Sequence, residues 1–300
     1  MLKPSFDPGL TQKFDRPLRR IINKDGSFNV QRVGTTWRDF HPYLHLTNMA
    51  WIPFLALLFL GYLTVNTVFA AIYYVFTPGQ LQGAAVSEAF WNDFFFSAHT
   101  LTTVGYGNIS PVGVGANLVA SFEGLLGVLG FAVATGLLYG RVSRPSAKIG
   151  FSPNAVITPY QDASSLQFRV VNLRSNSLVE LEARVLLMTV ERNGNSSRRS
   201  YSMLKLEREN VQFLPLTWTI VHPIDNESPL RGKTAEDLDR LQAELLILFK
   251  GYDDTFNQTV ITRYSYRHDE IRWDKRFAPA FYVNDDGDAV LEVHKVGTLA

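Results

Sequence analysis

Residues 50–76 read AWIPFLALLFLGYLTVNTVFAAIYYVF and contain no charged side chain. A helix needs about 20 residues, at about 1.5 Å rise each, to cross the hydrocarbon core of a bilayer. Trp51, Tyr73 and Tyr74 lie near the ends of the stretch, where aromatic rings favour the membrane interface. Pro53 falls in the first turn, where a missing N–H is tolerated. The stretch therefore predicts a transmembrane outer helix over residues 50–76.

A second apolar run, residues 112–139, is interrupted only by Glu123 and predicts an inner helix over residues 112–142. All 29 Lys and Arg residues lie outside residues 49–140. The second run is rich in glycine, which weakens a helix in water but allows close packing in a membrane bundle. We therefore expect a membrane domain over residues 49–142. The alternative, a buried hairpin of a soluble protein, fits poorly with the length of both runs.

The distribution of basic residues predicts the orientation of this membrane domain. Residues 1–48 carry eight Lys and Arg against four Asp, and Arg141, Arg144 and Lys148 follow the second run. The connection at residues 77–111 has no basic residue. The positive-inside rule then places both termini in the cytoplasm. The first 30 residues lack an apolar stretch, so no cleaved signal peptide is expected.

The connection contains a shorter apolar segment, residues 87–101, which reads SEAFWNDFFFSAHTL. It is too short to span a bilayer but apolar enough to enter one. Ser87 suits a helix N-cap, and Glu88 suits the positive end of the helix dipole. Non-helical backbone at membrane depth is tolerated only when it is buried in protein or lines water. The segment therefore predicts a re-entrant pore helix over residues 87–101, followed by a loop that faces a pore.

The loop reads Thr100-Leu-Thr-Thr-Val-Gly-Tyr-Gly107 and resembles the signature of potassium channels. The resemblance implies a selectivity filter over residues 102–107, in which backbone carbonyls replace the hydration shell of K⁺. The implied K⁺ ligands are the carbonyl oxygens of Thr103, Val104, Gly105 and Tyr106 and the Thr103 hydroxyl. Gly105 and Gly107 permit dihedral angles that a Cβ would penalise. One chain supplies one quarter of such a filter, so a homotetramer is required.

Two other interpretations of this loop are weaker. A Gly-Tyr-Gly sequence also suits a simple extracellular turn. A phosphate-binding glycine loop fits less well, because no Lys follows the motif and no G-x-G-x-x-G is present. Val104 and Tyr106 are expected to point away from the pore axis and to pack on Trp91 and residues 94–96.

The C-terminal half returns to the composition of a soluble domain over residues 143–300. It resembles inward-rectifier potassium channels, most closely their prokaryotic members. The resemblance is carried by these pieces: FSPNAVI (151–157), RVVNLR (169–174), LVE (178–180), WTIVHPID (218–225), ESPL (227–230) and EIRWDKRF (270–277). It implies an all-β, immunoglobulin-like cytoplasmic domain that extends the pore and gates it. Alternation at residues 179–187 independently predicts a half-buried strand.

Further strands are predicted at residues 166–173, 245–249, 260–263 and 289–293, with a short helix at residues 236–243. Residues 1–35 form a polar N-terminal segment. Trp37, Phe40 and Leu44 are spaced as on one helix face, which resembles the family's interfacial slide helix and predicts one over residues 36–48. Pro42 interrupts this pattern and leaves a loop as the alternative.

The resemblance implies passive K⁺ flux through an integral protein of the bacterial inner membrane, with K⁺ as the permeant ion and no organic cofactor. Neither an enzyme nor a nucleic-acid partner is expected. The chain has no G-x-S-x-G, H-E-x-x-H or P-loop motif, and its net charge is only +1. The absence of Cys excludes a disulfide framework and a thiolate metal site. Two alternatives remain open: a less selective cation channel of the same fold, and a non-conducting, membrane-anchored β-sandwich sensor.

Several more residues are candidates for gating and regulation. On the inner helix, Gly127, Phe131, Thr135 and Tyr139 recur every four residues, and the resemblance places them along the pore. Phe131 stands where strong rectifiers have an acid, which argues against strong rectification, and Tyr139 matches the ring that closes the pore. Gly127 or Gly136 is expected to be the hinge.

Charged residues outside and within the membrane complete the set. Arg141, Arg144 and Lys148 match the stretch that binds anionic phosphoinositides in the family, although the charges alone also serve to set the topology. Arg16, Arg19 and Arg20 are candidates to add to it. Glu123 is an ionisable group at membrane depth and is expected to support the filter, as is His99, where the family often has an acid. Asp254, next to Asp253, is expected at the cytoplasmic constriction.

Overall fold

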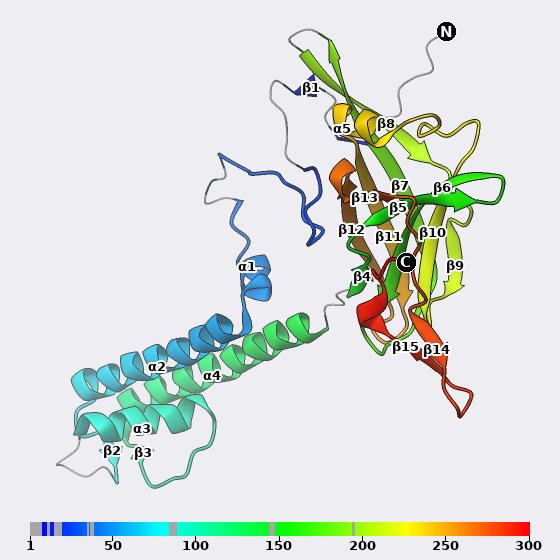
Figure 1. Ribbon diagram of the computed structural model, residues 1–300. Helices are drawn as coiled ribbons and strands as arrows, with labels where there is room; N and C mark the ends of the chain where they lie inside the picture. The colour runs from blue at the N-terminus through cyan, green and yellow to red at the C-terminus, as the bar shows by residue number, and fades with distance from the viewer. Residues whose placement is uncertain are drawn as a thin grey trace. The chain divides into compact units, whose positions relative to one another are not determined.

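The chain folds into two units, and Figure 1 shows the computed structural model. The structure describes residues 8–10, 13–14, 20–34, 36, 39–83, 89–143, 148–193 and 196–300. One unit comprises Val33–Arg144, here called the pore unit. The other, here called the cytoplasmic unit, comprises Met1–Arg32 together with Pro145–Ala300.

The pore unit is helical. Its described helices are α1 (Pro42–Asn48), α2 (Trp51–Phe76), α3 (Ala89–Leu101) and α4 (Gly113–Val142). Among the described residues, α2 and α4 are the helices long and apolar enough to cross a membrane. They lie side by side, and α3 packs against both (Figure 1). The expected two-span architecture with a short helix between the spans is confirmed.

The apolar surfaces of the two long helices are mostly exposed in the single chain. Ile52, Phe59 and Leu118 are examples, each with at least 61% of its surface accessible. The hydrophobic effect would not leave this much apolar surface in water. Lipid or other copies of the chain must therefore cover it.

The helix before the first span is shorter than the sequence predicts. α1 begins at Pro42, whereas the predicted helix began at residue 36. His41 is extended, with φ −105° and ψ 100°, because the residue before a proline is sterically excluded from the α region. Pro42 itself suits the first helical position. Phe40 and Leu44 therefore do not share one helix face, and Trp37 lies outside the described residues.

The cytoplasmic unit is built from two β-sheets. The first has the order β1-β8-β7-β11-β12, with β9 on β7, and the second has the order β10-β6-β5-β13, with β4 on β6. The strands of the first sheet are β1 (Lys13–Phe14), β7 (Leu178–Asn193), β8 (Ser196–Leu204), β9 (Asn210–Phe213), β11 (Glu244–Asp253) and β12 (Gln258–Arg267). Those of the second are β4 (Ile149–Phe151), β5 (Ala155–Tyr160), β6 (Ala163–Asn172), β10 (Thr217–Ile224) and β13 (Ile271–Trp273).

One hydrophobic core joins these two sheets. Phe168 and Ile220 from the second sheet and Leu245 and Phe249 from the first are at most 2% exposed and belong to the same buried cluster. The sheets therefore face each other as a sandwich. The helix α5 (Ala235–Arg240) and the hairpin β14 (Phe281–Val283) and β15 (Ala289–Leu291) complete the unit. A mainly β cytoplasmic domain is confirmed.

The segment that precedes the pore unit in sequence packs on the first sheet. Ile21 and Ile22 are buried against Met188, Tyr201 and Leu246. Because this apolar contact has the character of a core, the segment is an integral part of the cytoplasmic unit.

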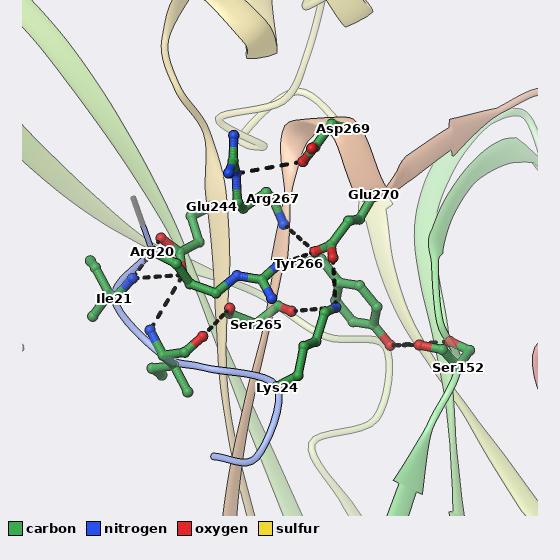
Figure 2. Close-up of polar contacts among 11 residues, drawn as sticks. Arg20, Ile21, Lys24, Ser152, Glu244, Ser265, Tyr266, Arg267, Asp269 and Glu270 are labelled. Atoms are coloured by element: carbon green, nitrogen blue, oxygen red, sulfur yellow. Dashed lines mark hydrogen bonds and ion pairs between the residues drawn. The ribbon is translucent and has the colours of Figure 1, made fainter. Parts of the chain in front are cut away.

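Polar contacts also bind residues 20–24 to the rest of the cytoplasmic unit (Figure 2). The buried carboxylate of Glu244 accepts the backbone N–H of Ile21 at 3.1 Å and that of Ile22 at 3.5 Å. Burial raises the pKa of Glu244. Arg20 and Lys24 both pair with Glu270, and the Lys24 ammonium lies 4.3 Å from the centre of the Tyr264 ring. Arg20 is thus engaged with protein, while Arg16 and Arg19 lie outside the described residues.

Candidate functional site

The loop of interest leaves the C-terminal end of α3 and folds back on it. The Val104 and Gly105 N–H groups both donate to the carbonyl oxygen of His99, at 2.9 and 3.2 Å. The Thr103 N–H donates to the Thr100 carbonyl at 3.0 Å. These bonds satisfy carbonyls that a helix end leaves free, and they fix the starting direction of the loop.

Backbone handedness alternates along this loop. Thr103, Gly105 and Gly107 have φ values of +60°, +54° and +79°, whereas Val104 and Tyr106 between them do not have positive φ. Glycine adopts positive φ without a steric penalty, but for β-branched Thr103 it is strained. Strained dihedrals persist where the surroundings impose them, and they concentrate at functional sites.

The two large side chains of the loop are exposed in the single chain. Val104 is 51% accessible and Tyr106 is 74% accessible. The Tyr106 ring meets the His99 ring edge to face, with centroids 4.8 Å apart. Trp91 makes its ring contacts along its own helix, with Phe90, Phe94 and Phe95. Within one chain the expected packing of Tyr106 on Trp91 is therefore replaced by packing on His99.

A buried polar network lies between α3, which carries the loop, and the two long helices. Glu123 on α4 is fully buried; its Oε2 accepts a hydrogen bond from the Tyr73 hydroxyl, at 2.7 Å, and its Oε1 is within hydrogen-bonding distance of Ser97 Oγ. Ser97 Oγ also lies 3.1 Å from Oδ1 of Asn66 on α2. The network thus connects both long helices to α3. The sequence predicted that Glu123 faces α3, but it did not single out Asn66 and Ser97, whose signal is a polar side chain inside an apolar segment.

Gly127 differs from the other inner-helix candidates in its burial. It is buried, and a Cβ there would lie 2.1 Å from the carbonyl oxygen of Leu101, the last residue of α3. Phe131, Thr135 and Tyr139 are exposed in the single chain, with Phe131 at 76% and Tyr139 at 73%. The expectation that all four line one face therefore fails for Gly127, because the close approach of α3 and α4 occupies its open side.

Arg141 is held by protein groups. Its guanidinium donates to the carbonyl oxygens of Leu46 and Met49 at the end of α1, the latter at 2.6 Å. It also lies over the rings of Trp51 and Phe54, 4.7 and 4.3 Å from their centres. Cations commonly satisfy the last carbonyls of a helix in this way. Arg141 was expected to bind lipid, but its two terminal guanidinium nitrogens donate to carbonyl oxygens of the pore unit.

The remaining candidates differ in their surroundings. Lys148 is exposed, and Arg144 lies outside the described residues. Asp254 is exposed in the turn between β11 and β12. Its neighbour Asp253 is buried and accepts a hydrogen bond from Asn176 Nδ2 at 2.7 Å and another from the Thr255 N–H at 3.1 Å. Asp253 therefore stabilises this turn, and Asp254 is the acid available to ions.

Comparison with known protein families covers most of the chain. Residues 50–144 match the family described as "Ion channel", and residues 149–298 match the "Inward rectifier potassium channel C-terminal domain". These two ranges correspond to the α2–α4 region and to the β-sandwich.

Individual relatives agree with the family matches. The inward rectifier potassium channel Kirbac3.1 of Paramagnetospirillum magnetotacticum is 37% identical, covering 94% of this chain and 96% of its own length. The human G protein-activated inward rectifier potassium channel 1 is 26% identical over 94% of this chain, which spans 61% of the human protein. The chain belongs to the inward rectifier potassium channel family.

Proposed function

We propose that four copies of the chain form a K⁺-selective channel in which residues 102–107 of each copy supply one quarter of the filter. The observation that carries the proposal is the alternation of φ at Thr103, Gly105 and Gly107. In a uniform strand, successive carbonyls point to opposite sides. Alternating the handedness of the backbone turns successive carbonyls toward one side, which is the arrangement that K⁺ coordination needs.

The proposed K⁺ ligands are the carbonyl oxygens of Thr103, Val104, Gly105 and Tyr106, together with the Thr103 hydroxyl. Four identical loops around a symmetry axis would surround a dehydrated ion with these oxygens. The apolar faces of α2 and α4, which are exposed in one chain, support assembly of several copies in lipid.

Gating is proposed to reside at the end of α4. Tyr139 is exposed there, two residues before Arg141, which fixes α1 to the same helix. A ring of four Tyr139 side chains would narrow a pore and exclude water from it. We further propose that the cytoplasmic unit and anionic lipid, the latter through Lys148 and Arg144, bias this gate. Asp254 would raise the local concentration of cations at the inner mouth.

Liposomes test the proposal directly. The full-length protein, reconstituted with K⁺ inside, is expected to give K⁺ flux that barium blocks and that graded anionic lipid modulates. Replacement of external K⁺ by Na⁺ should shift the reversal potential as a K⁺-selective pathway requires. A purified tetramer that conducts neither ion would contradict the proposal and would favour a sensor role.

A less selective cation channel is the second candidate. The observation that favours it is the ring contact between His99 and Tyr106. His99 stands at the position where the family often has an acid that supports the filter. Equal permeability to K⁺ and Na⁺ in mixed solutions would establish this alternative.

A further inference from the structure

We infer that Glu123 carries a proton in the folded channel and that, as a neutral acid, it is a positioning residue that holds α3 between the two spans. The inference deepens the function proposed above, because α3 carries the loop at residues 103–107. Its first test does not depend on ion flux, so the two proposals can fail separately.

The orientation of the Asn66 amide is the starting point. Asn66 Nδ2 lies 2.7 Å from the carbonyl oxygen of Tyr62, one turn earlier in α2. Only the NH₂ group can face a carbonyl oxygen at this distance, since two acceptors would repel each other. Oδ1 is therefore the amide atom that faces Ser97 Oγ at 3.1 Å, and Ser97 must donate its proton to it.

The number of protons available in the network then determines whether the Glu123 carboxyl group is protonated. A serine hydroxyl has one proton, and that of Ser97 is already directed to Asn66. Ser97 Oγ nevertheless contacts Glu123 Oε1. An ionised carboxylate has no proton to place between these two oxygens, whereas a protonated Glu123 donates to Ser97 Oγ. The other carboxyl oxygen, Oε2, accepts from the Tyr73 hydroxyl at 2.7 Å, so every group has a partner.

The surroundings of this network favour the neutral acid. Asn66, Ser97 and Glu123 are fully buried and Tyr73 is 1% exposed. No Lys or Arg occurs between residues 49 and 140, so neither this chain nor an identical neighbour offers a permanently charged cation from this stretch. The other acid that is buried in the described part of the pore unit, Asp93, lies one turn before Ser97 on α3 and would add a second negative charge close to Tyr73. An ionised carboxylate buried without a positive partner is very costly.

The neutral acid completes a chain of hydrogen bonds that runs in one direction. Glu123 donates to Ser97, Ser97 donates to Asn66, and Asn66 donates to the Tyr62 carbonyl. Such chains strengthen each member and fix the geometry of the elements that they join. Here the joined elements are α4, α3 and α2, so the position of α3, and with it the loop, depends on the proton of Glu123.

Infrared spectroscopy tests the protonation state. The difference spectrum between wild type and Glu123→Gln, each full length and reconstituted in lipid at neutral pH, should contain the C=O band of a protonated carboxyl group in the wild type only. Gln keeps both contacts, because Nε2 donates to Ser97 Oγ and Oε1 accepts from Tyr73, so the variant is expected to fold. A difference spectrum that contains only carboxylate bands would overturn the inference.

Flux measurements test the positioning role. Glu123→Gln should retain K⁺ flux within about twofold, whereas Glu123→Ala and Ser97→Ala should each lose at least about tenfold, because both interrupt the chain of hydrogen bonds. Ser121→Ala is the matched control, since Ser121 Oγ donates only to Asn117 of its own helix, at 2.8 Å, in the described structure. Loss of flux in Glu123→Gln, or equal losses in Ser97→Ala and Ser121→Ala, would contradict the role. If the wild-type protein itself fails to conduct, the channel proposal fails. The infrared spectrum still shows whether Glu123 is protonated.

Discussion

Replacement of Arg141 by Ala is expected to release α1 from α4. The substitution removes two hydrogen bonds from the guanidinium to the Leu46 and Met49 carbonyls, and also its contacts with the Trp51 and Phe54 rings. Hydrogen bonds to charged groups contribute about 1.5–3 kcal/mol each, and cation–π contacts add about 0.5–2 kcal/mol. Leu46 and Met49 are half-buried, so water recovers part of the loss, and we take about 3 kcal/mol as the net cost.

Hydrogen exchange of α1 measures this cost. Since each 1.4 kcal/mol is a factor of about ten, a cost of about 3 kcal/mol should raise the opening equilibrium of α1 by about 100-fold. Exchange is followed by mass spectrometry on peptides that cover Pro42–Asn48, with the protein in detergent free of anionic lipid. Arg141→Lys should give an intermediate value, because an ammonium lacks the planar fork that reaches two carbonyls together.

Lys148→Ala is the matched control for Arg141→Ala. Lys148 is exposed, so its removal should leave the exchange of α1 unchanged and should act only on the response to anionic lipid. Exchange in Arg141→Ala within about threefold of wild type, together with loss of the lipid response, would refute the reasoning and restore Arg141 as a lipid ligand.

Three further outcomes are expected. Gly105→Ala should abolish K⁺ flux, because the site has φ +54°, while size-exclusion chromatography still shows the proposed tetramer; undiminished flux would count against the proposed ligands. Tyr139→Ala should raise the open probability in single-channel records, and unchanged gating would remove it as the gate. Burial lowers the pKa of His222, so the folded state resists protonation, and unfolding free energy should fall below about pH 6.5 by up to about 1.4 kcal/mol per pH unit. Thermal unfolding at neutral and acidic pH checks this, and an equal acid loss in His222→Gln would exclude His222 as the cause.

Much of the pore unit was predictable because its pattern is local. The charge-free stretch predicted residues 50–76, and the helix observed is Trp51–Phe76. The inner helix was expected from residue 112 and begins at Gly113. A long apolar run leaves few alternatives to a helix in lipid, since every backbone group must be paired within the segment. The start of α1 was missed, although Pro42 contained the signal.

The five predicted strands match observed strands in position but not in length, and others, such as β5, β8 and β10, were not predicted. The alternation at residues 179–187 marked only part of β7, which continues to Asn193. From Val185 to its end the strand pairs with β8, whose sequence SSRRSYSML carries little apolar periodicity. Its pairing is a property of the assembled sheet, which a local pattern does not contain.

The contacts of single polar residues were the least predictable part of the site. Ser97 and Asn66 are 31 positions apart, and they meet only because α2 and α3 pack together. Arg141 looked like a lipid ligand because its charge lies beside the membrane, yet the carbonyls at the end of α1 bind it first. Such partners depend on tertiary contacts and not on spacing along the chain.

The burial of residues 21 and 22 in the cytoplasmic unit limits how many times the polypeptide can cross a bilayer. Both side chains pack among Met188, Tyr201 and Leu246. No lipid layer can run through a folded core, so the chain leaves this body after Arg32 and rejoins it from Pro145 on the same aqueous side. The number of complete crossings between these points is therefore even. Because α2 and α4 already provide two, the 13-residue α3 cannot be a third complete crossing, whatever the charge of its flanks.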